Sequence, residues 1–281
     1  MPSNTDITAA QLSRLIGLPP RGSGGAPAII DVRDDEDYAA DPRLLPCTLK
    51  RDWDKTASWI DAWNPPPGTR AVVVCQKGLK LSEGVAALLR TRGVAAEVLE
   101  GGFLAWREAG GFLVSPEKLP PRDAKGGTTW VTRARPKIDR IACPWLIRRF
   151  VDASATFLYV AASEVTAVAE RFNAAPFDID NTFWSHRGEN CTFDTMLQEF
   201  GLKSEALDRL AVIVRGADTN RLDLAPQSAG LLAASLGLSR AYRDDLEQLE
   251  ASMLLYDAFY RWCRDAVGET HDWPGHSRKG R

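Results

Sequence analysis

Three short runs of β-branched and other apolar residues alternate with helical stretches in the N-terminal part of the chain, and this alternation constrains the fold more than any other feature. The runs cover residues 28–32, 71–75 and 95–99. Between them lie residues 54–63, which start with an Asp, and residues 81–91, which are soon followed by a Gly, as helices often are. Strand and helix in alternation are typical of a parallel sheet covered by helices, so the N-terminal fold is predicted to be α/β.

The length and composition of the chain predict two globular domains. The chain has 281 residues, and a typical domain has about 150. It is 44% hydrophobic and 26% charged, and its formal net charge of -2 gives no overall reason to expect binding to nucleic acid. It contains no run of about 18 apolar residues that could span a bilayer, and its start lacks the pattern of a secretory signal. We therefore expect a cytoplasmic protein that does not bind a membrane.

The five cysteines agree with this location. Cys47, Cys75, Cys143, Cys191 and Cys263 are scattered along the chain and form no C-x-x-C pair. This distribution is typical of reduced thiols and does not suggest a disulfide framework.

A polar segment rich in Pro and Gly divides the chain. Residues 115–129 show no hydrophobic period and are predicted to form a linker. The linker separates a first domain at residues 5–114 from a second at residues 130–273, and a polar tail follows at residues 274–281.

The second domain is predicted to be mainly α-helical. Apolar residues recur at spacings of three and four, as on the buried face of a helix, in residues 165–172, 193–200 and 207–214. A long last helix is expected over residues 242–263. Its apolar stripe is too wide for a solvated helix, which leaves room for a homodimer. Residues 156–160 and 176–180 are predicted to be short strands.

Cys75 stands where the second apolar run ends and a helix begins. The loop between them consists of Gln76, Lys77, Gly78, Leu79 and Lys80. Backbone N–H groups in such a loop, together with the positive end of the helix, stabilise a thiolate or a bound anion. Lys77 and Lys80 add two cations. The pattern predicts a cysteine nucleophile beside an anion site, suited to attack on a sulfur, phosphorus or arsenic oxyanion.

The first domain resembles a rhodanese (sulfurtransferase) domain in three ordered motifs: residues 30–38, the loop 75–80 and residues 99–106. The resemblance implies that Cys75 accepts a sulfane sulfur from a donor such as thiosulfate, becomes a persulfide and passes the outer sulfur to a thiol or cyanide. It also implies that the amides of the loop, from Gln76 to Leu81, cradle the sulfur, and that Asp31 and Arg33 form a pair that positions the loop. No cofactor is required for this transfer.

Two departures from the rhodanese pattern bear on activity. Lys80 stands where the family often has Arg, and residues 41–47 replace a Gly-His-Ile segment. Lys cannot make the bidentate contact that Arg offers to an oxyanion, so a different donor preference and rate are expected. Leu81 stands where the related phosphatase loop ends in Arg, so hydrolysis of phosphate esters is not expected. The alternative is a rhodanese fold that only binds, with Cys75 as a buried thiol.

A basic segment opens the second domain. This part of the sequence contains a single acidic residue, Asp139, and six basic residues. The basic residues are Arg133, Arg135, Lys137, Arg140, Arg148 and Arg149. Arg133, Arg135, Lys137 and Arg140 are a candidate oxyanion site, and the alternative is a solvated basic face. Pro144 is expected at the first position of a helix.

A second cluster could hold a divalent metal. His186, Glu189, Cys191 and Asp194 lie close enough in sequence to share a cation, and candidate outside ligands are Asp139, Asp178, Asp180 and Asp218. Thr192 is predicted to cap the following helix, which would place Cys191 at its positive end and favour a thiolate. The spacing matches no standard zinc pattern, and helix capping with hydrogen bonding is the alternative. Cys143 and Cys263 are expected to be core thiols.

The second domain resembles the C-terminal domain of the ChrB-type chromate-resistance proteins in residues 137–150, 176–194 and 214–218. The resemblance implies a role in chromate resistance and, in some members, chromate-dependent control of transcription. Three hypotheses follow: a sulfurtransferase acting on small oxyanion or thiol substrates, a sensor or regulator that binds chromate or DNA, and a metal-dependent activity. DNA binding is the weaker branch of the second, because the basic segment is short and no helix-turn-helix pattern is present.

Overall fold

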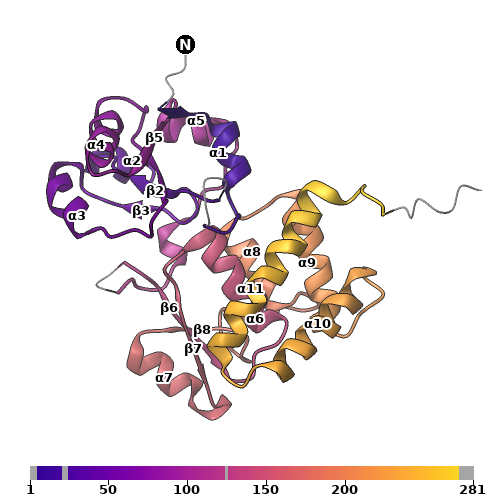
Figure 1. Ribbon diagram of the computed structural model, residues 1–281. Coiled ribbons are helices and arrows are strands. Elements are labelled where there is room, and N and C mark those ends of the chain that lie inside the picture. Colours follow the sequence, from indigo (N-terminus) through magenta and orange to yellow (C-terminus); the bar gives the residue numbers. More distant parts are fainter. Residues whose placement is uncertain (1–4, 21–24, 124–125, 272–281) are drawn as a thin grey trace, which may run out of the picture.

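The computed structural model describes residues 5–20, 25–123 and 126–271, and it consists of two parts that follow one another along the chain (Figure 1). The first is an α/β unit, and the second is mainly helical with one small sheet. Both fold classes are as predicted from the sequence. The predicted tail at residues 274–281, with the last residues of the second domain, lies outside the described residues.

The first part is built on a parallel sheet of five strands in the order β1-β5-β4-β2-β3. The strands are β1 (Asp6–Ile7), β2 (Ala28–Asp31), β3 (Leu49–Lys50), β4 (Arg70–Val74) and β5 (Ala95–Leu99). The three central strands, β2, β4 and β5, are those expected from the apolar runs. The edge strands β1 and β3 have two residues each, too few to show a sequence pattern.

Helices cover both faces of this sheet. They are α1 (Ala9–Leu15), α2 (Asp35–Ala40), the 3-10 turn Trp53–Lys55 with α3 (Thr56–Ala62), α4 (Lys80–Thr91) and α5 (Gly102–Glu108). Alternate strand residues pack on opposite sides, since Val72 shares a core with α1 and α5, while Val73 shares one with α3 and α4. The helix expected over residues 54–63 becomes α-helical only at Thr56.

The second part combines a small parallel sheet with a bundle of helices. Its strands are β6 (Thr129–Arg133), β7 (Thr156–Val160) and β8 (Ala175–Pro176), in the order β7-β6-β8. Its helices are α6 (Asp139–Leu146) with the π-turn Ile147–Val151, the 3-10 turn Ala162–Glu164 with α7 (Val165–Phe172), α8 (Thr192–Phe200), α9 (Glu205–Asp218), α10 (Gln227–Ala241) and α11 (Asp245–Arg261) with the π-turn Trp262–Ala266. A short turn also follows α5, at Pro116–Lys118 within the predicted linker.

Two local predictions for the second part were wrong in their bounds. The strand predicted over residues 176–180 ends at Pro176, because Asp178 adopts φ +51° and leaves the extended region. The last helix starts at Asp245 and not at residue 242, because Asp244 caps it by accepting the N–H groups of Leu246 and Glu247.

Pro144 lies inside α6 and not at its first position. A proline in a helix leaves the carbonyl four residues earlier without its N–H donor. Here that carbonyl belongs to Arg140, and it accepts the hydroxyl of Tyr159 at 2.9 Å. A tertiary contact that the local sequence does not reveal therefore makes an internal proline tolerable.

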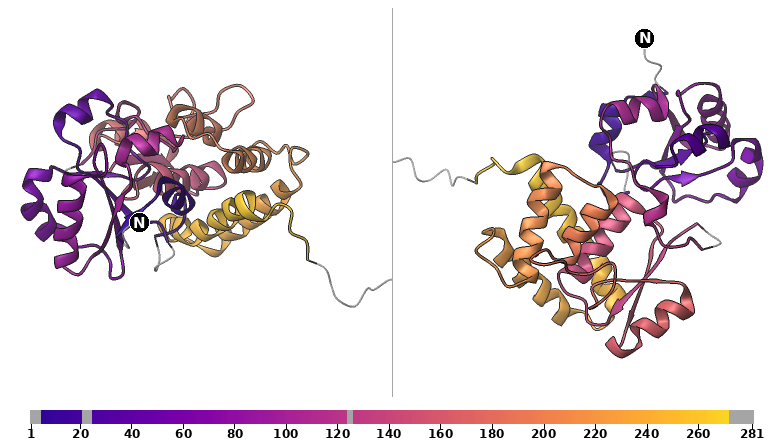
Figure 2. Two further views of the ribbon diagram at one scale, coloured as in Figure 1. Left: turned by 90° about the horizontal axis from the view of Figure 1, so that it is seen from above. Right: turned by 180° about the vertical axis from the view of Figure 1, so that it is seen from behind.

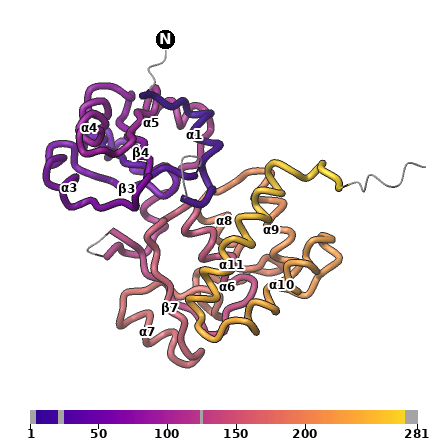
Figure 3. Tube along the Cα trace, in the orientation of Figure 1, coloured from indigo at the N-terminus to yellow at the C-terminus, as the bar shows by residue number. Residues whose placement is uncertain are grey.

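The two parts share one hydrophobic core. Phe150 packs edge-on against Phe112, at 5.9 Å between ring centroids, and against Tyr260 at 5.4 Å. Gly17, just after α1, lies so close to Phe150 that a Cβ there would stand 2.4 Å from the ring. The additional views and the Cα trace place α1 beside the end of α11 (Figures 2 and 3). The core of the first part therefore continues into the second.

Two sequence predictions, one on membrane binding and one on a homodimer, concern the helices. None of those within the described ranges is both long enough and apolar enough to cross a membrane. Along α11, Leu249, Met253 and Tyr256 are buried, whereas Leu246 and Leu254 are exposed. The homodimer stays a prediction.

Candidate functional site

Cys75 directly follows β4 and lies at the floor of the loop that leads into α4. Its Sγ accepts the backbone N–H of Leu79 at 3.3 Å and lies 3.1 Å from the hydroxyl of Ser82. Only 5% of Cys75 is exposed, while Lys77, Leu79 and Lys80 at the rim are exposed. The thiol thus has polar donors around it and two cations at the surface above it. Ser82 is a neighbour that the sequence analysis did not single out.

The backbone of the loop is packed against the start of α5. The carbonyls of Cys75 and Gln76 accept the N–H groups of Phe103 and Leu104 at 2.9 and 3.1 Å. Gly78 has φ +67°, and a Cβ there would stand 2.4 Å from the carbonyl oxygen of Leu99. The loop therefore requires glycine at this position, and its shape depends on the β5–α5 corner.

Asp31 and Arg33 form a fully buried ion pair at 2.7 Å. Arg33 also donates to the carbonyls of Asp41 and Arg43, and its guanidinium carbon lies 3.9 Å from the ring centroid of Phe103. Phe103 is the residue whose amide supports the carbonyl of Cys75. Phe103 of α5 therefore links the Asp31–Arg33 pair to the loop.

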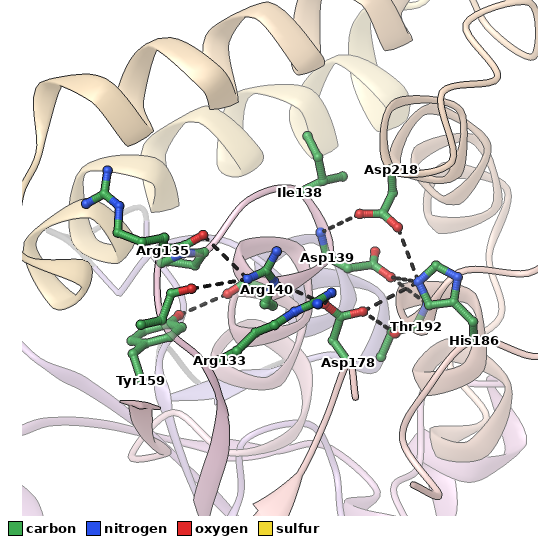
Figure 4. Close-up of polar contacts among 12 residues, drawn as sticks. Arg133, Arg135, Ile138, Asp139, Arg140, Tyr159, Asp178, His186, Thr192 and Asp218 are labelled. Carbon is green, nitrogen blue, oxygen red and sulfur yellow. Dashed lines mark hydrogen bonds and ion pairs between the residues drawn. The ribbon is translucent and has the colours of Figure 1, made fainter. Parts of the chain in front are cut away.

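A second cluster of polar side chains lies in the second part, and we call it the histidine–aspartate cluster (Figure 4). His186 Nε2 is 3.2 Å from Asp218 Oδ2, 3.4 Å from Asp178 Oδ1 and 3.6 Å from Asp139 Oδ2. The four residues come from four places in the fold: the start of α6, the segment after β8, the segment before α8 and the end of α9. Packing brings them together from positions far apart in sequence.

Asp139 is the most deeply buried member of the histidine–aspartate cluster. Its Oδ2 accepts the N–H groups of Thr192 and Phe193 at the start of α8. Its Oδ1 is buried and has no hydrogen-bond partner among the described residues. Just before it, Ile138 has φ +39°, an unusual value for a β-branched residue. Its carbonyl accepts the hydroxyl of Tyr256 at 3.1 Å, so the surrounding helices hold this strained turn.

The charges inside the histidine–aspartate cluster shift the pKa values of two of its members. Burial, followed by the charges of Asp218 and Asp178, raises the pKa of Asp139 well above its ordinary value. Hydrogen bonds to Asp178 and Asp218 raise the pKa of His186 to about 10. With no cation bound, His186 is therefore an imidazolium at neutral pH, held by carboxylates.

Of the four residues grouped from the sequence as metal ligands, only His186 lies in the histidine–aspartate cluster. Glu189 is exposed in the segment before α8. Asp194 accepts the N–H of Cys191 at 3.0 Å and pairs with Arg215 at 3.2 Å. Three of the outside ligands considered from the sequence, Asp139, Asp178 and Asp218, take the other places, and the fourth, Asp180, is exposed.

The prediction of a thiolate at Cys191 was wrong. Cys191, and not Thr192, is the N-cap residue of α8. Burial, followed by the charges of Asp139 and Asp194, raises the pKa of the Cys191 thiol well above its ordinary value. Desolvation and two carboxylates outweigh the helix dipole, so Cys191 stays a thiol. Cys143 and Cys263 are buried core thiols, as expected.

The basic residues of this segment point to different parts of the structure. Arg140 and Arg133 approach Asp178 Oδ2 at 3.1 and 3.9 Å, beside the histidine–aspartate cluster. Arg135 turns away toward α10 and α11, where it donates to backbone carbonyls and pairs with Asp245 at 3.7 Å (Figure 4). Lys137 is exposed. Arg148 and Arg149 pair with Glu250 and Asp257 of α11.

Comparison with known proteins assigns both parts of the chain. The family model of the rhodanese-like domain matches residues 9–109, and that of the ChrB C-terminal domain matches residues 130–263. The chain joins a rhodanese-like domain to a ChrB C-terminal domain. The Cys75 loop lies in the rhodanese-like domain, and the histidine–aspartate cluster lies in the ChrB C-terminal domain.

Individual proteins similar to this chain include one curated relative and several solved structures. The Protein ChrB of Cupriavidus metallidurans is 30% identical over 190 residues, which cover 63% of this chain and 57% of that protein. The chain therefore spans little more than half the length of this curated relative. A rhodanese-like domain protein from Staphylococcus aureus is 27% identical and has a TM-score of 0.30, covering 36% of this chain and 90% of that one. A thiosulfate sulfurtransferase from Pseudomonas aeruginosa is 22% identical and has a TM-score of 0.34. The match covers 41% of this chain and 20% of that one.

Proposed function

We propose that the protein is a cytoplasmic sulfurtransferase of the rhodanese type, linked to chromate resistance, in which Cys75 carries the sulfur. The observation that carries this proposal is the position of Cys75 Sγ at the floor of the loop, where it accepts the Leu79 N–H at 3.3 Å. A thiolate or a persulfide is an anion and is stabilised by such donors at a helix N-terminus. The ChrB C-terminal domain and the ChrB relative support the association with chromate resistance.

The reaction needs only the sulfur donor, Cys75 and an acceptor. The Cys75 thiolate attacks the sulfane sulfur of thiosulfate, the sulfur–sulfur bond of the donor breaks, and sulfite leaves with the electron pair. Cys75 then carries a persulfide. An acceptor thiolate attacks the outer sulfur and leaves as a persulfide itself, which returns Cys75 to the thiolate without any net redox change in the protein.

Residues around Cys75 have distinct parts in this reaction. Lys77 and Lys80 are exposed at the rim and attract a dianionic donor. Lys80 is the first residue of α4. Its ammonium can bind an oxygen of the donor as a point charge but not in the bidentate way of an Arg. The hydroxyl of Ser82 lies 3.1 Å from Sγ and donates to the carbonyl of Leu79 at 3.0 Å, so it would have to turn from that carbonyl to donate to the persulfide.

Intact mass after incubation with thiosulfate tests the proposal. The wild-type protein is expected to gain one sulfur atom, and Cys75→Ser is expected to gain none. Cys47→Ser is the matched control, because burial raises the pKa of the Cys47 thiol to about 12, so Cys47 is not a competing nucleophile. A gain that persists in Cys75→Ser, or no gain in the folded wild type, would overturn the proposal.

A further inference from the structure

We propose that the histidine–aspartate cluster of the ChrB C-terminal domain binds a divalent cation of the Mn²⁺ or Fe²⁺ class through Asp139, His186 and Asp218, with Asp178 supporting His186 from the side. This site is separate from the Cys75 loop and shares no residue with it. The proposal goes beyond sulfur transfer, and a failure of one proposal leaves the other standing.

The spacing of the side-chain atoms fits a coordination shell. Ligand atoms about 2.1 Å from one ion lie about 3.0 to 3.4 Å from one another at octahedral or tetrahedral angles. His186 Nε2 lies 3.2, 3.4 and 3.6 Å from oxygens of the three aspartates. Single ligand atoms of Asp139, His186 and Asp218 also lie within 4.8 Å of one another. Nε2 carries at most one proton, which cannot serve three carboxylates, whereas one cation can contact Asp139, His186 and Asp218 together.

A buried oxygen without a hydrogen-bond partner is a second, independent observation that points to a cation. Asp139 is fully buried and points into the histidine–aspartate cluster, and its Oδ1 has no hydrogen-bond partner within the described residues (Figure 4). Leaving such an atom buried and unsatisfied costs free energy, and a metal ion removes that cost.

Surrounding groups hold the carboxylates in place. Asp178 Oδ1 accepts the hydroxyl of Thr192 at 3.0 Å, and Asp218 Oδ1 is 3.4 Å from the N–H of Asp139. These outer contacts orient one oxygen of each carboxylate and leave Asp218 Oδ2 facing His186. Partners of this kind are the usual support of metal ligands. Asp178 itself has φ +51°, a backbone strain that places its side chain between His186 and Arg140.

The donor set selects the class of ion. Carboxylate oxygens suit Mg²⁺, Ca²⁺ and Mn²⁺, and imidazole suits Fe, Zn, Ni and Cu, so one imidazole with two carboxylates favours Mn²⁺ or Fe²⁺. The buried thiol of the neighbouring Cys191 is not in the set of ligand atoms that lie within 4.8 Å of one another among the described residues, so the donor set contains no sulfur. His186 is 41% exposed, so one side of the ion would face solvent, next to the half-exposed Arg133. An anion could bind on that side.

Titration of the metal-free, full-length protein with Mn²⁺ tests this site. The paramagnetic resonance signal of free Mn²⁺ reports the bound fraction. We expect one ion per wild-type chain, and a loss of affinity of at least about tenfold in His186→Ala and in Asp218→Asn. Thermal unfolding in the same buffers should show that Mn²⁺ raises the midpoint of the wild type and leaves that of the two variants unchanged.

Glu189→Gln is the matched control. It removes one negative charge near His186, as Asp218→Asn does, but from an exposed side chain, so it should bind Mn²⁺ like the wild type. The thermal scans also report whether each variant is folded. Equal binding by His186→Ala and the wild type, or no binding by the folded wild type at millimolar Mn²⁺, would contradict the proposal.

Discussion

At the scale of single residues, Arg33 shows how one buried charge organises the rhodanese-like domain. It pairs with Asp31 and donates to the carbonyls of Asp41 and Arg43. The carboxylate of Asp41 in turn binds Arg43 at 2.6 Å and Arg107 at 3.4 Å. The segment around Asp41 thus links Arg33 to α5, which supports the Cys75 loop.

Asp41 should give the protein a specific sensitivity to acid. Its hydrogen bond with Arg43 lowers its pKa from 3.8 to about 2. The folded state therefore favours the charged form, and this stabilisation is present above about pH 4 and is lost as the pH falls toward about 2. In urea unfolding, the stability difference between the wild type and Asp41→Asn should be largest at neutral pH and shrink over that range. A difference that stays constant over it would contradict this assignment. The control, Asp61→Asn, removes an exposed pair with Arg92 and should change little at any pH.

Gly78 should be essential for the shape of the Cys75 loop. Gly78→Ala places a Cβ 2.4 Å from the Leu99 carbonyl at φ +67°, so we expect a loss of about 1 to 3 kcal/mol in unfolding free energy. Loading of sulfur on Cys75 should fall with it. Gly84→Ala, inside α4 with open space around it, should be neutral or stabilising. Chemical denaturation and the intact-mass assay measure both variants, and equal stability of the two would show that the close contact is unimportant.

At the scale of elements, the contact between α6 and α11 organises the ChrB C-terminal domain. Asp257 of α11 accepts the indole N–H of Trp145 at 2.8 Å and binds Arg149 at 2.8 Å. Tyr256, next to it, holds the carbonyl of Ile138. One turn of α11 therefore fixes both ends of the segment that presents Asp139.

Asp257→Ala should lower the unfolding free energy much more than Glu250→Ala. Asp257→Ala leaves Arg149 and the indole of Trp145 without their partner inside the protein, and should cost about 3 to 5 kcal/mol of unfolding free energy. Glu250→Ala breaks a pair between the same two elements, but Glu250 is 64% exposed, so a loss of about 0 to 1 kcal/mol is expected. Urea unfolding compares the two. Similar losses would mean that burial does not decide the strength of these pairs.

At the scale of the whole molecule, the two domains form one structural unit. Aromatic residues of the second domain pack against the end of α1, and Arg264 donates to the carbonyl of Arg14 at 3.2 Å. Cys47 of the first domain lies 3.5 Å from the carbonyl of Arg148 in the second. With a shared core, we expect the domains to unfold together.

Gly17 tests this coupling. Gly17→Ala places a Cβ 2.4 Å from the ring of Phe150, which is fully buried and cannot move aside easily. Gly68→Ala creates nearly the same backbone strain, φ +80° against +78°, but in open space. We expect Gly68→Ala to cost about 1 kcal/mol and Gly17→Ala clearly more, with earlier proteolysis in both domains. Calorimetry and limited proteolysis measure this, and equal effects would argue against a tightly packed interface.

The amino-acid sequence by itself determined the features that depend on neighbouring residues. The three central strands, the helix after Cys75 and the stripe in α9 follow from hydrophobic period and turn chemistry, which act over a few residues. Cys75 and its loop could be predicted for the same reason. His186 could be singled out as a chemically active side chain, and its three partners could be named among the candidate ligands, but the sequence could not separate them from Glu189, Cys191, Asp194 and Asp180.

Only the tertiary structure decided which distant groups meet. Asp139, Asp178 and Asp218 come from three elements, and packing, not spacing, brings them to His186. Burial beside Asp139 keeps Cys191 protonated where the local pattern favoured a thiolate. Tyr159 lets Pro144 lie inside α6. Each outcome depends on desolvation and on contacts between residues far apart in the chain, which a local pattern does not contain.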